Sequence, residues 1–309
     1  MSLSPGVLGW LRRRLIEPEP ALVAIEVRPQ TLGVVRRARD RPALAAAACL
    51  ELPPGTLRLS MTEPNLVAPD AFRSALEGAL ARAGAIGGGR VALVLPDPVA
   101  RLTLLPAEGL KGRRAEVEEL IRFRLRKVVP FDVRQARVAA VPAAPGQLLV
   151  AAILESVLNE FEAACASLGL HAGRVELAGP ALLPWVAPAG DRLLVNWDAD
   201  YVSLLLLRDG APILVRTLVG EAIASGDQVA REASNTLLYY RERLGGGSLA
   251  GVSVRLAGAS PEPALAALAE ALGSVPERID PWRGEAAAAS LPDAAALAGA
   301  AACVLGRAA

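Results

Sequence analysis

The sequence predicts a duplicated α/β fold with two domains. Its 309 residues are enough for two domains of about 150 residues each. Residues 21–50 have the pattern of three successive strands, and the same strand, strand, strand plan returns over residues 191–220. Helix-like segments follow each set, at 69–83 and 228–244, and both end at glycine-rich stretches. An internal duplication accounts for this order most simply.

The composition favours an aliphatic core and excludes whole-chain disorder. Apolar residues make up 53% of the chain, charged residues 21% and aromatic residues only 4%, so Leu, Val, Ile and Ala must fill the interior. The 33 basic and 32 acidic residues leave a net charge of +1. This balance gives no reason to expect nucleic acid as a partner.

The cysteines and the hydropathy pattern predict a soluble, cytosolic protein. Cys49, Cys165 and Cys303 are odd in number and far apart, which favours reduced, buried thiols. The longest apolar runs are too short to cross a bilayer, and the N-terminus lacks a typical cleavable signal.

The first twenty residues stand apart as a short amphipathic segment. Val7, Leu8, Leu11 and Leu15 fall on one helical face, and Arg12–Arg14 follow Trp10. Two interpretations stay open, a helix docked on its own domain and a basic contact with the inner membrane or a partner.

An inserted α/β unit interrupts the first domain. Strand patterns at 91–95 and 101–105 precede a charged helix at 113–127, then strands at 133–141 and 148–154 and a helix at 156–168. We therefore expect a first domain of residues 21–88 and 156–188, joined by a C-terminal helix at 292–309. The inserted unit takes 89–155, and the second domain takes 189–291.

Several catalytic and metal chemistries are excluded. The one histidine, His171, lies in a glycine-containing stretch that we interpret as a surface turn, and three-histidine zinc sites and Ser-His-Asp triads need more than it offers. No P-loop motif occurs, and the triplets Gly87–Gly89 and Gly245–Gly247 follow helices instead of preceding them. We expect no metal site and no catalytic residues.

The ordered motifs resemble the PilM family of type IV pilus assembly proteins, with GspL and FtsA as cousins. The residues that carry this resemblance run in order along the chain: the hairpin 23–34, the turn 52–55, the strand 101–106, the helix end 124–131 with Pro130 and Phe131, the hairpin 193–207, the segment 212–216, the helix 237–241 and the strand 252–260. The resemblance implies an actin-like (ribonuclease H-like) duplicated fold with an inserted FtsA/PilM-type α/β subdomain.

The same resemblance locates a nucleotide site and suggests that it is degenerate. Relatives that bind ATP use two hairpin turns with Asp and Gly. Here Glu26 and Arg28 replace that pair in the first turn, and Asn196 and Asp198 replace it in the second. The adenosine turn keeps Gly258. An Arg side chain fills the space that Gly leaves for a phosphate, and a carboxylate repels phosphates. No cofactor is expected, and weak ATP and magnesium binding at Glu26 and Asp198 is the alternative.

The resemblance then implies a non-catalytic scaffold at the cytoplasmic face of the inner membrane. Its expected partner is the cytoplasmic N-terminal tail of a PilN-like membrane protein, with an assembly motor ATPase as a further partner and peripheral membrane association. The alternatives are an actin-like ATPase and a GspL-like component of type II secretion.

A partner groove is expected between the first domain and the inserted unit. Extended peptides bind by adding hydrogen bonds at a sheet edge while apolar side chains fill pockets. The strand 101–105 offers such an edge, and the helix 113–127 offers a wall, although a plain core role for Ile121 and Leu125 stays open. The predicted partner-binding residues are Arg101, Leu102, Leu104, Ile121, Phe123, Arg124 and Phe131.

Overall fold

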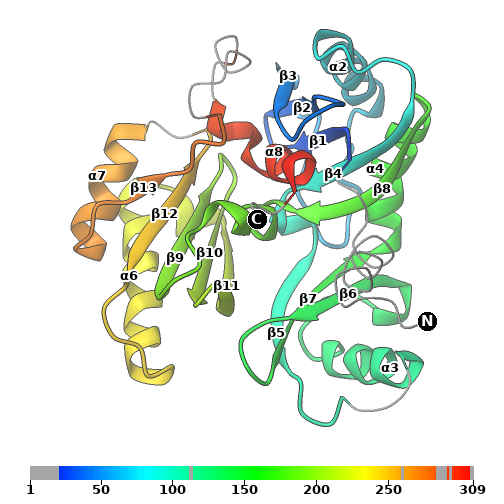
Figure 1. Ribbon diagram of the computed structural model, residues 1–309. Helices are drawn as coiled ribbons and strands as arrows, with labels where there is room; N and C mark the ends of the chain where they lie inside the picture. Colours follow the sequence, from blue (N-terminus) through cyan, green and yellow to red (C-terminus); the bar gives the residue numbers. More distant parts are fainter. Residues whose placement is uncertain (1–20, 111–113, 259–260, 283–290, 292–293, 307–309) are drawn as a thin grey trace, which may run out of the picture.

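The computed structural model describes residues 21–110, 114–258, 261–282, 291 and 294–306, arranged around three sheets (Figure 1). The predicted amphipathic segment 1–20 lies outside these residues. Among the described helices, none is both long and apolar enough to cross a membrane.

The first domain is built on a five-stranded sheet with the order β3-β2-β1-β4-β8. Three strands form an antiparallel meander and two run parallel to the first of them. The strands are β1 (Val23–Val27), β2 (Thr31–Arg37), β3 (Leu44–Glu51), β4 (Gly89–Leu95) and β8 (Leu170–Leu177). Because β1 and β4 are buried on both faces, they are almost continuously apolar.

Helices cover both faces of this sheet. On one side, α2 (Pro69–Arg82) and α4 (Glu155–Ala166) meet through Phe72 and Phe161, whose rings lie edge to face with centroids 6.2 Å apart. On the other side, α5 (Ala178–Ala181) and α8 (Ala298–Leu305) pack small residues against the strands. The C-terminal helix α8 therefore packs on the sheet of the first domain.

The second domain repeats the same topology in the order β11-β10-β9-β12-β13. Its strands are β9 (Asp191–Trp197), β10 (Tyr201–Arg208), β11 (Ala211–Val219), β12 (Gly251–Leu256) and β13 (Glu277–Arg278), and its helices are α6 (Gly226–Arg243) and α7 (Pro261–Leu272). A meander followed by parallel strands occurs in both domains. The duplication predicted from the sequence is confirmed.

The inserted unit is a three-stranded antiparallel sheet with one helix. Its order is β5-β7-β6, with β5 (Arg101–Pro106), β6 (Ala136–Pro142), β7 (Gln147–Leu154) and α3 (Arg114–Leu125). Alternate side chains face opposite ways along these strands. Leu105 and Val150 pack toward α3, while Leu102 and Leu149 join the core of the first domain.

Short 3₁₀ turns lie between or within these units. They are η1 (Asp97–Val99), η2 (Val133–Gln135), η3 (Leu183–Trp185), η4 (Gly220–Ile223) and η6 (Ala294–Leu297).

Two expectations are wrong in the structure. The segment 89–95, expected at the start of the inserted unit, is the β4 strand of the first domain, because its apolar run pairs in parallel with β1. The inserted unit therefore begins only at β5. His171, expected in a turn, lies in β8, where it pairs with Arg90 of β4. The neighbouring Gly169 and Gly173 obscured this strand in the sequence.

The three cysteines, all within the described residues, form no disulfide, and two are buried. Burial raises the pKa of the thiols of Cys165 and Cys303 to about 12. Since the thiolate is the reactive form, both should resist maleimide at neutral pH.

We expect the native protein to react rapidly at no more than one thiol, that of Cys49, and at all three in denaturant. Mass spectrometry of Cys49→Ser should then show almost no rapid labelling. Rapid labelling of Cys165 or Cys303 in the native protein contradicts the buried positions.

Candidate functional site

A cluster of charged side chains lies where the two domains meet, beside α8, which Figure 1 shows between the two large sheets. Glu26 and Arg28 come from β1 and the turn after it, Asn196 and Asp198 from β9 and the turn after it. Each is at most 5% exposed. The structure thus brings together the four hairpin-turn residues singled out in the sequence.

Arg28 and Asp198 join the two hairpin turns directly. The Arg28 Nε donates to Asp198 Oδ2 at 2.9 Å, and Nη2 donates to Oδ1 at 3.2 Å. Two parallel bonds of this kind are the strong geometry for a guanidinium and a carboxylate. The two positions at which the family resemblance implies glycine are therefore filled by a buried ion pair between the domains.

Arg255, on β12, is the centre of the cluster. Its Nε donates to Asn196 Oδ1 at 2.7 Å. Its terminal nitrogens lie 3.3 Å from Glu26 Oε1 and 3.4 Å from Asp198 Oδ2. The Arg255 guanidinium thus lies between Glu26 and Asp198, the two carboxylates considered in the sequence analysis as ligands for an ion.

Glu26 also holds the C-terminal helix. Its Oε2 accepts the backbone N–H of Ala300, in the first turn of α8, at 2.7 Å. A carboxylate is stabilised at a helix N-terminus by the free N–H groups and the helix dipole. An added Cβ at Gly299 would lie 3.1 Å from that same carboxylate oxygen, so glycine lets the helix approach Glu26 closely.

Asp97, in η1, is a further buried carboxylate next to this cluster. Its carboxylate accepts the Gly179 N–H at 2.9 and 3.1 Å and the Asn196 side-chain amide at 3.1 Å. Asn196 therefore links Asp97 on one side to Arg255 on the other. The network runs from the first domain through β9 to β12.

The carboxyl groups of the cluster differ in their electrostatics. Burial raises the pKa of Glu26 and of Asp97 above their ordinary values. Burial acts in the same direction on Asp198, but the guanidinium groups of Arg28 and Arg255 outweigh it and hold the pKa of Asp198 below its ordinary value. Asp198 is therefore the carboxylate whose charged form is favoured most by its neighbours, the guanidinium groups of Arg28 and Arg255.

The glycine turn after β12 closes against the turn after β9. Gly258 has a φ of +86°, and a Cβ there would lie 3.0 Å from the Ala199 Cβ and 3.1 Å from the Ala199 backbone nitrogen. In this chain Gly258 permits close contact between two turns of the same domain.

The arrangement is suited to hold the domains together. Glu26, Asp97 and Asp198 each already accept hydrogen bonds or ion pairs from protein groups. Within the described residues, no group of three His, Cys, Asp or Glu side chains is placed to hold a metal ion.

Sequence reasoning missed two members of this cluster. Arg255 interrupts the apolar strand Val252–Leu256, and Asp97 lies between two prolines after β4. A charged residue inside an apolar strand must be paired when it is buried, and this signal would have identified Arg255.

The predicted partner-binding residues do not form one surface. Leu102 and Ile121 are 8% and 4% exposed and belong to the hydrophobic cores. Leu104 and Phe131 are half-buried and pack against these cores, while Arg101 is exposed. The expected edge strand β5 does lie at a sheet edge, but β11 runs alongside it.

The helix α3 turns Phe123 away from the sheet. Residues two apart on a helix point to nearly opposite sides, so buried Ile121 and Phe123, 57% exposed, cannot line the same groove. The Phe123 ring lies 5.7 Å from the Arg126 guanidinium. Arg124 donates to the carbonyls of Pro106 and Glu108 and so fixes the end of β5.

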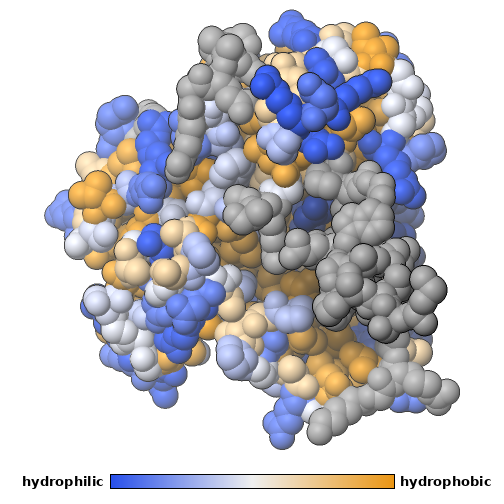
Figure 2. Space-filling model, viewed as in Figure 1, coloured by the Kyte–Doolittle hydropathy of each residue, from blue (hydrophilic) through white to orange (hydrophobic). Residues whose placement is uncertain are grey.

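The outer edge of the inserted sheet is β6, and it is apolar and exposed. Ala139, Ala140, Val141 and Pro142 are all exposed, and Val141 is 53% exposed. Alternate side chains of β6 point to the same face of the sheet. Ala139 and Val141 therefore lie on the face through which β5 and β7 contact the first domain. Figure 2 shows apolar surface over this inserted unit.

Two copies of one α/β plan, one in each domain, are the arrangement of the actin-like fold. No protein-family model matches the chain, and no curated protein matches it. A chain of the PilM-PilN type IV pilus biogenesis complex is 21% identical, with a TM-score of 0.72 over 93% of this chain and 97% of that one.

A second solved structure supports the same fold class. A Bacteroides thetaiotaomicron protein with actin-like ATPase fold and unknown function is 11% identical. Its TM-score is 0.53 over 85% of this chain and 93% of that chain. The chain therefore has the actin-like fold and shares it along nearly its whole length with the pilus-assembly chain.

Removing the central guanidinium should destabilise the protein strongly. Arg255→Met keeps much of the side-chain volume but leaves Glu26 and Asp198 with fewer partners, which should lower the free energy of unfolding by about 3–5 kcal/mol. Arg174→Met is the matched control. It breaks a half-exposed pair with Glu176 (2.7 Å) and should lower that free energy by less than about 1 kcal/mol.

Urea unfolding of both variants measures the difference. Similar small losses for the two would mean that the buried cluster contributes little to the cohesion of the domains.

Proposed function

We propose that this chain is a non-catalytic scaffold of a type IV pilus-like assembly platform at the cytoplasmic face of the inner membrane. In this proposal it holds the cytoplasmic N-terminal tail of a PilN-like membrane protein. The observation that carries the non-catalytic part is the buried Arg28–Asp198 pair that joins the two hairpin turns. The partner is suggested by the likeness to a chain of the PilM-PilN complex.

The buried cluster favours a scaffold over a kinase or ATPase. Phosphoryl transfer needs space for the phosphates and metal-binding carboxylates. Here the Arg28 side chain fills that space, and the Arg255 guanidinium lies between the two carboxylates. Binding of a nucleotide in this position would require two buried ion pairs to separate, which is costly in free energy.

The tail is proposed to bind along β6 instead of the β5 edge inferred from the sequence. β6 is the edge strand with exposed apolar side chains, whereas β11 lies beside β5. A peptide can extend the sheet at β6 while its apolar side chains contact Val141 and the half-buried Ile153 of β7. The site stays between the inserted unit and the first domain.

Magnesium ATP should shift the melting temperature little, even at millimolar concentration. A ligand that does not bind the native state adds no stability. Differential scanning fluorimetry over a range of ATP concentrations measures this. A saturable increase of several degrees would show that the cleft opens for nucleotide and would favour the ATPase alternative.

A charge on β6 should weaken binding of the tail. Val141→Arg places a cation on the proposed surface and should weaken binding of a tail peptide about tenfold or more. Val219→Arg is a close control, because Val219 is also 53% exposed and also lies on an edge strand, β11. Fluorescence anisotropy with a labelled tail peptide gives both affinities.

The same assay separates the competing docking surfaces. Phe123→Ala removes the exposed ring of α3 and should leave the affinity unchanged. Weakened binding by Phe123→Ala together with full binding by Val141→Arg would move the docking site to the outer face of α3.

A further inference from the structure

Several loops lie together at the end of the first domain where β1, β4 and β8 begin. Because β4 and β8 run parallel to β1, the starts of all three strands and the β2–β3 hairpin share this end. Hydrogen bonds join the loops there. Arg36 donates to the Ala83 carbonyl at the end of α2, and the Gly89 N–H donates to the Gly169 carbonyl, which links two of the loops.

This end is basic. Arg39 and Arg41 lie in the β2–β3 hairpin, Arg82 in the last turn of α2, and Arg90 at the start of β4, and all four are exposed. None of them forms an ion pair with another described residue. We call these four residues the basic rim.

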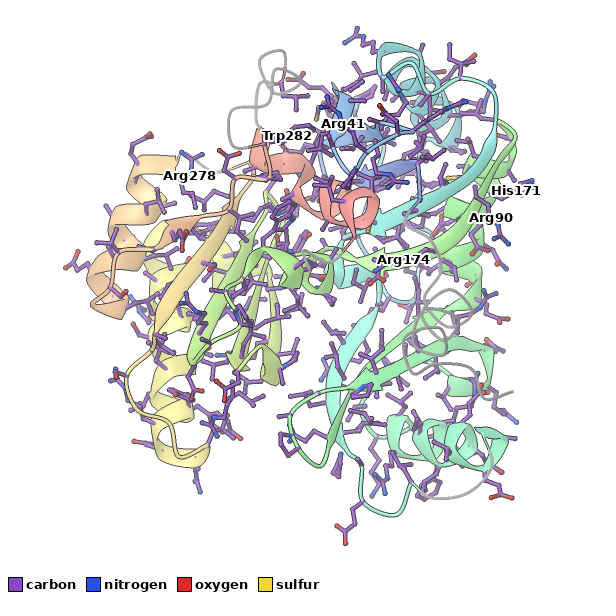
Figure 3. The ribbon with its side chains drawn as sticks, in the orientation of Figure 1. Arg41, Arg90, His171, Arg174, Arg278 and Trp282 are labelled. Carbon is purple, nitrogen blue, oxygen red and sulfur yellow. The ribbon has the colours of Figure 1, made fainter. Side chains whose placement is uncertain are left out.

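Figure 3 labels two residues of the rim, Arg41 and Arg90, both on the first domain. In Figure 3, Arg90 lies beside His171, the residue with which it pairs in register, and Arg41 lies on the same domain. Asp40 is the acidic residue of the hairpin that carries Arg39 and Arg41. Positive charge therefore dominates the loops at this end.

Two exposed apolar side chains accompany the rim. Ile86, in the loop between α2 and β4, is 78% exposed, and Leu22, just before β1, is 40% exposed. Ile86 is followed by three glycines, so no neighbouring side chain on that side shields it. Basic residues around protruding apolar ones are the combination that anionic lipid surfaces bind.

The chain order adds a second argument. Residues 1–20 lead into Ala21, directly beside Leu22 and therefore at this same end of the domain. Their sequence contains Arg12–Arg14 and the apolar residues of one predicted helical face. A second segment with basic and apolar residues thus joins the chain next to the rim.

We propose that the basic rim, with Ile86 and Leu22, is a docking surface for an anionic lipid bilayer. Arg39, Arg41, Arg82 and Arg90 contact the phosphate headgroups, and Ile86 enters the boundary between headgroups and acyl chains. The surface lies apart from β6, so the chain can contact lipid and a protein tail at the same time. Bilayer contact orients the first domain with its strand starts toward the membrane.

Vesicle flotation of the full chain tests this proposal. The vesicles contain about one third phosphatidylglycerol in phosphatidylcholine, and pure phosphatidylcholine vesicles are the neutral control. Arg39→Gln with Arg41→Gln removes two charges, each contributing about 1 kcal/mol near anionic lipid, and should weaken binding about thirtyfold. Arg241→Gln with Arg243→Gln, exposed residues near the end of α6, is the matched control and should bind normally.

One further variant and one change of salt concentration test whether the lipid contact lies at the rim. Ile86→Ser should weaken binding several-fold, and about 0.5 M salt should remove most of it. The affinity of the Arg39→Gln Arg41→Gln variant for a tail peptide, measured without lipid, should stay unchanged. A negative result for lipid docking can therefore be told apart from a negative result for the scaffold proposal.

Three results would overturn the proposal. The first is equal binding to neutral and anionic vesicles, and the second is equal loss in the two arginine pairs. The third is full vesicle binding by the Arg39→Gln Arg41→Gln variant together with complete loss on deletion of residues 1–20. That result assigns lipid contact to the N-terminal segment and leaves the rim to a protein partner or a second copy.

Discussion

The guanidinium group of Arg255 is the interaction on which the arrangement of the two domains depends. It lies between Glu26 of the first domain and Asp198 of the second, and Glu26 in turn binds the first turn of α8. A buried charge is tolerated only when its partners are in place. The positions of β1, β9, β12 and α8 are therefore coupled, because displacement of any one of them exposes or unpairs a charge.

The coupling also bears on the nucleotide site that the family resemblance implied. That resemblance places a nucleotide against the two hairpin turns. In this structure the Arg28–Asp198 ion pair joins the two turns directly. Under the scaffold proposal, this ion pair holds the domains that carry β6, β11 and the basic rim in fixed relative positions.

The duplication could be predicted because the strand patterns at residues 21–50 and 191–220 are strong and local. The family resemblance also located the four hairpin-turn residues, which lie in one cluster, while their role toward a nucleotide stays a prediction. The pairing of β4 with β1 was missed, because a continuous apolar strand carries no information about which sheet it joins. Likewise, Phe123 and Ile121 were assigned to one groove, although helix geometry places them on opposite sides. Arg255 was overlooked because its partner Glu26 is 229 residues away in the sequence, beyond any local pattern.

The apolar β6 edge has a consequence for the protein when it is alone. Among the described strands none pairs with the outer side of β6, so its backbone groups beside the exposed Ala139, Ala140 and Val141 can pair with another copy as well as with a partner. Lysine or proline at the tip of an edge strand usually prevents such pairing, and here Pro142 protects only the last position. If the tail binds at β6 as proposed, synthesis of this chain in excess of its partner would therefore favour self-association.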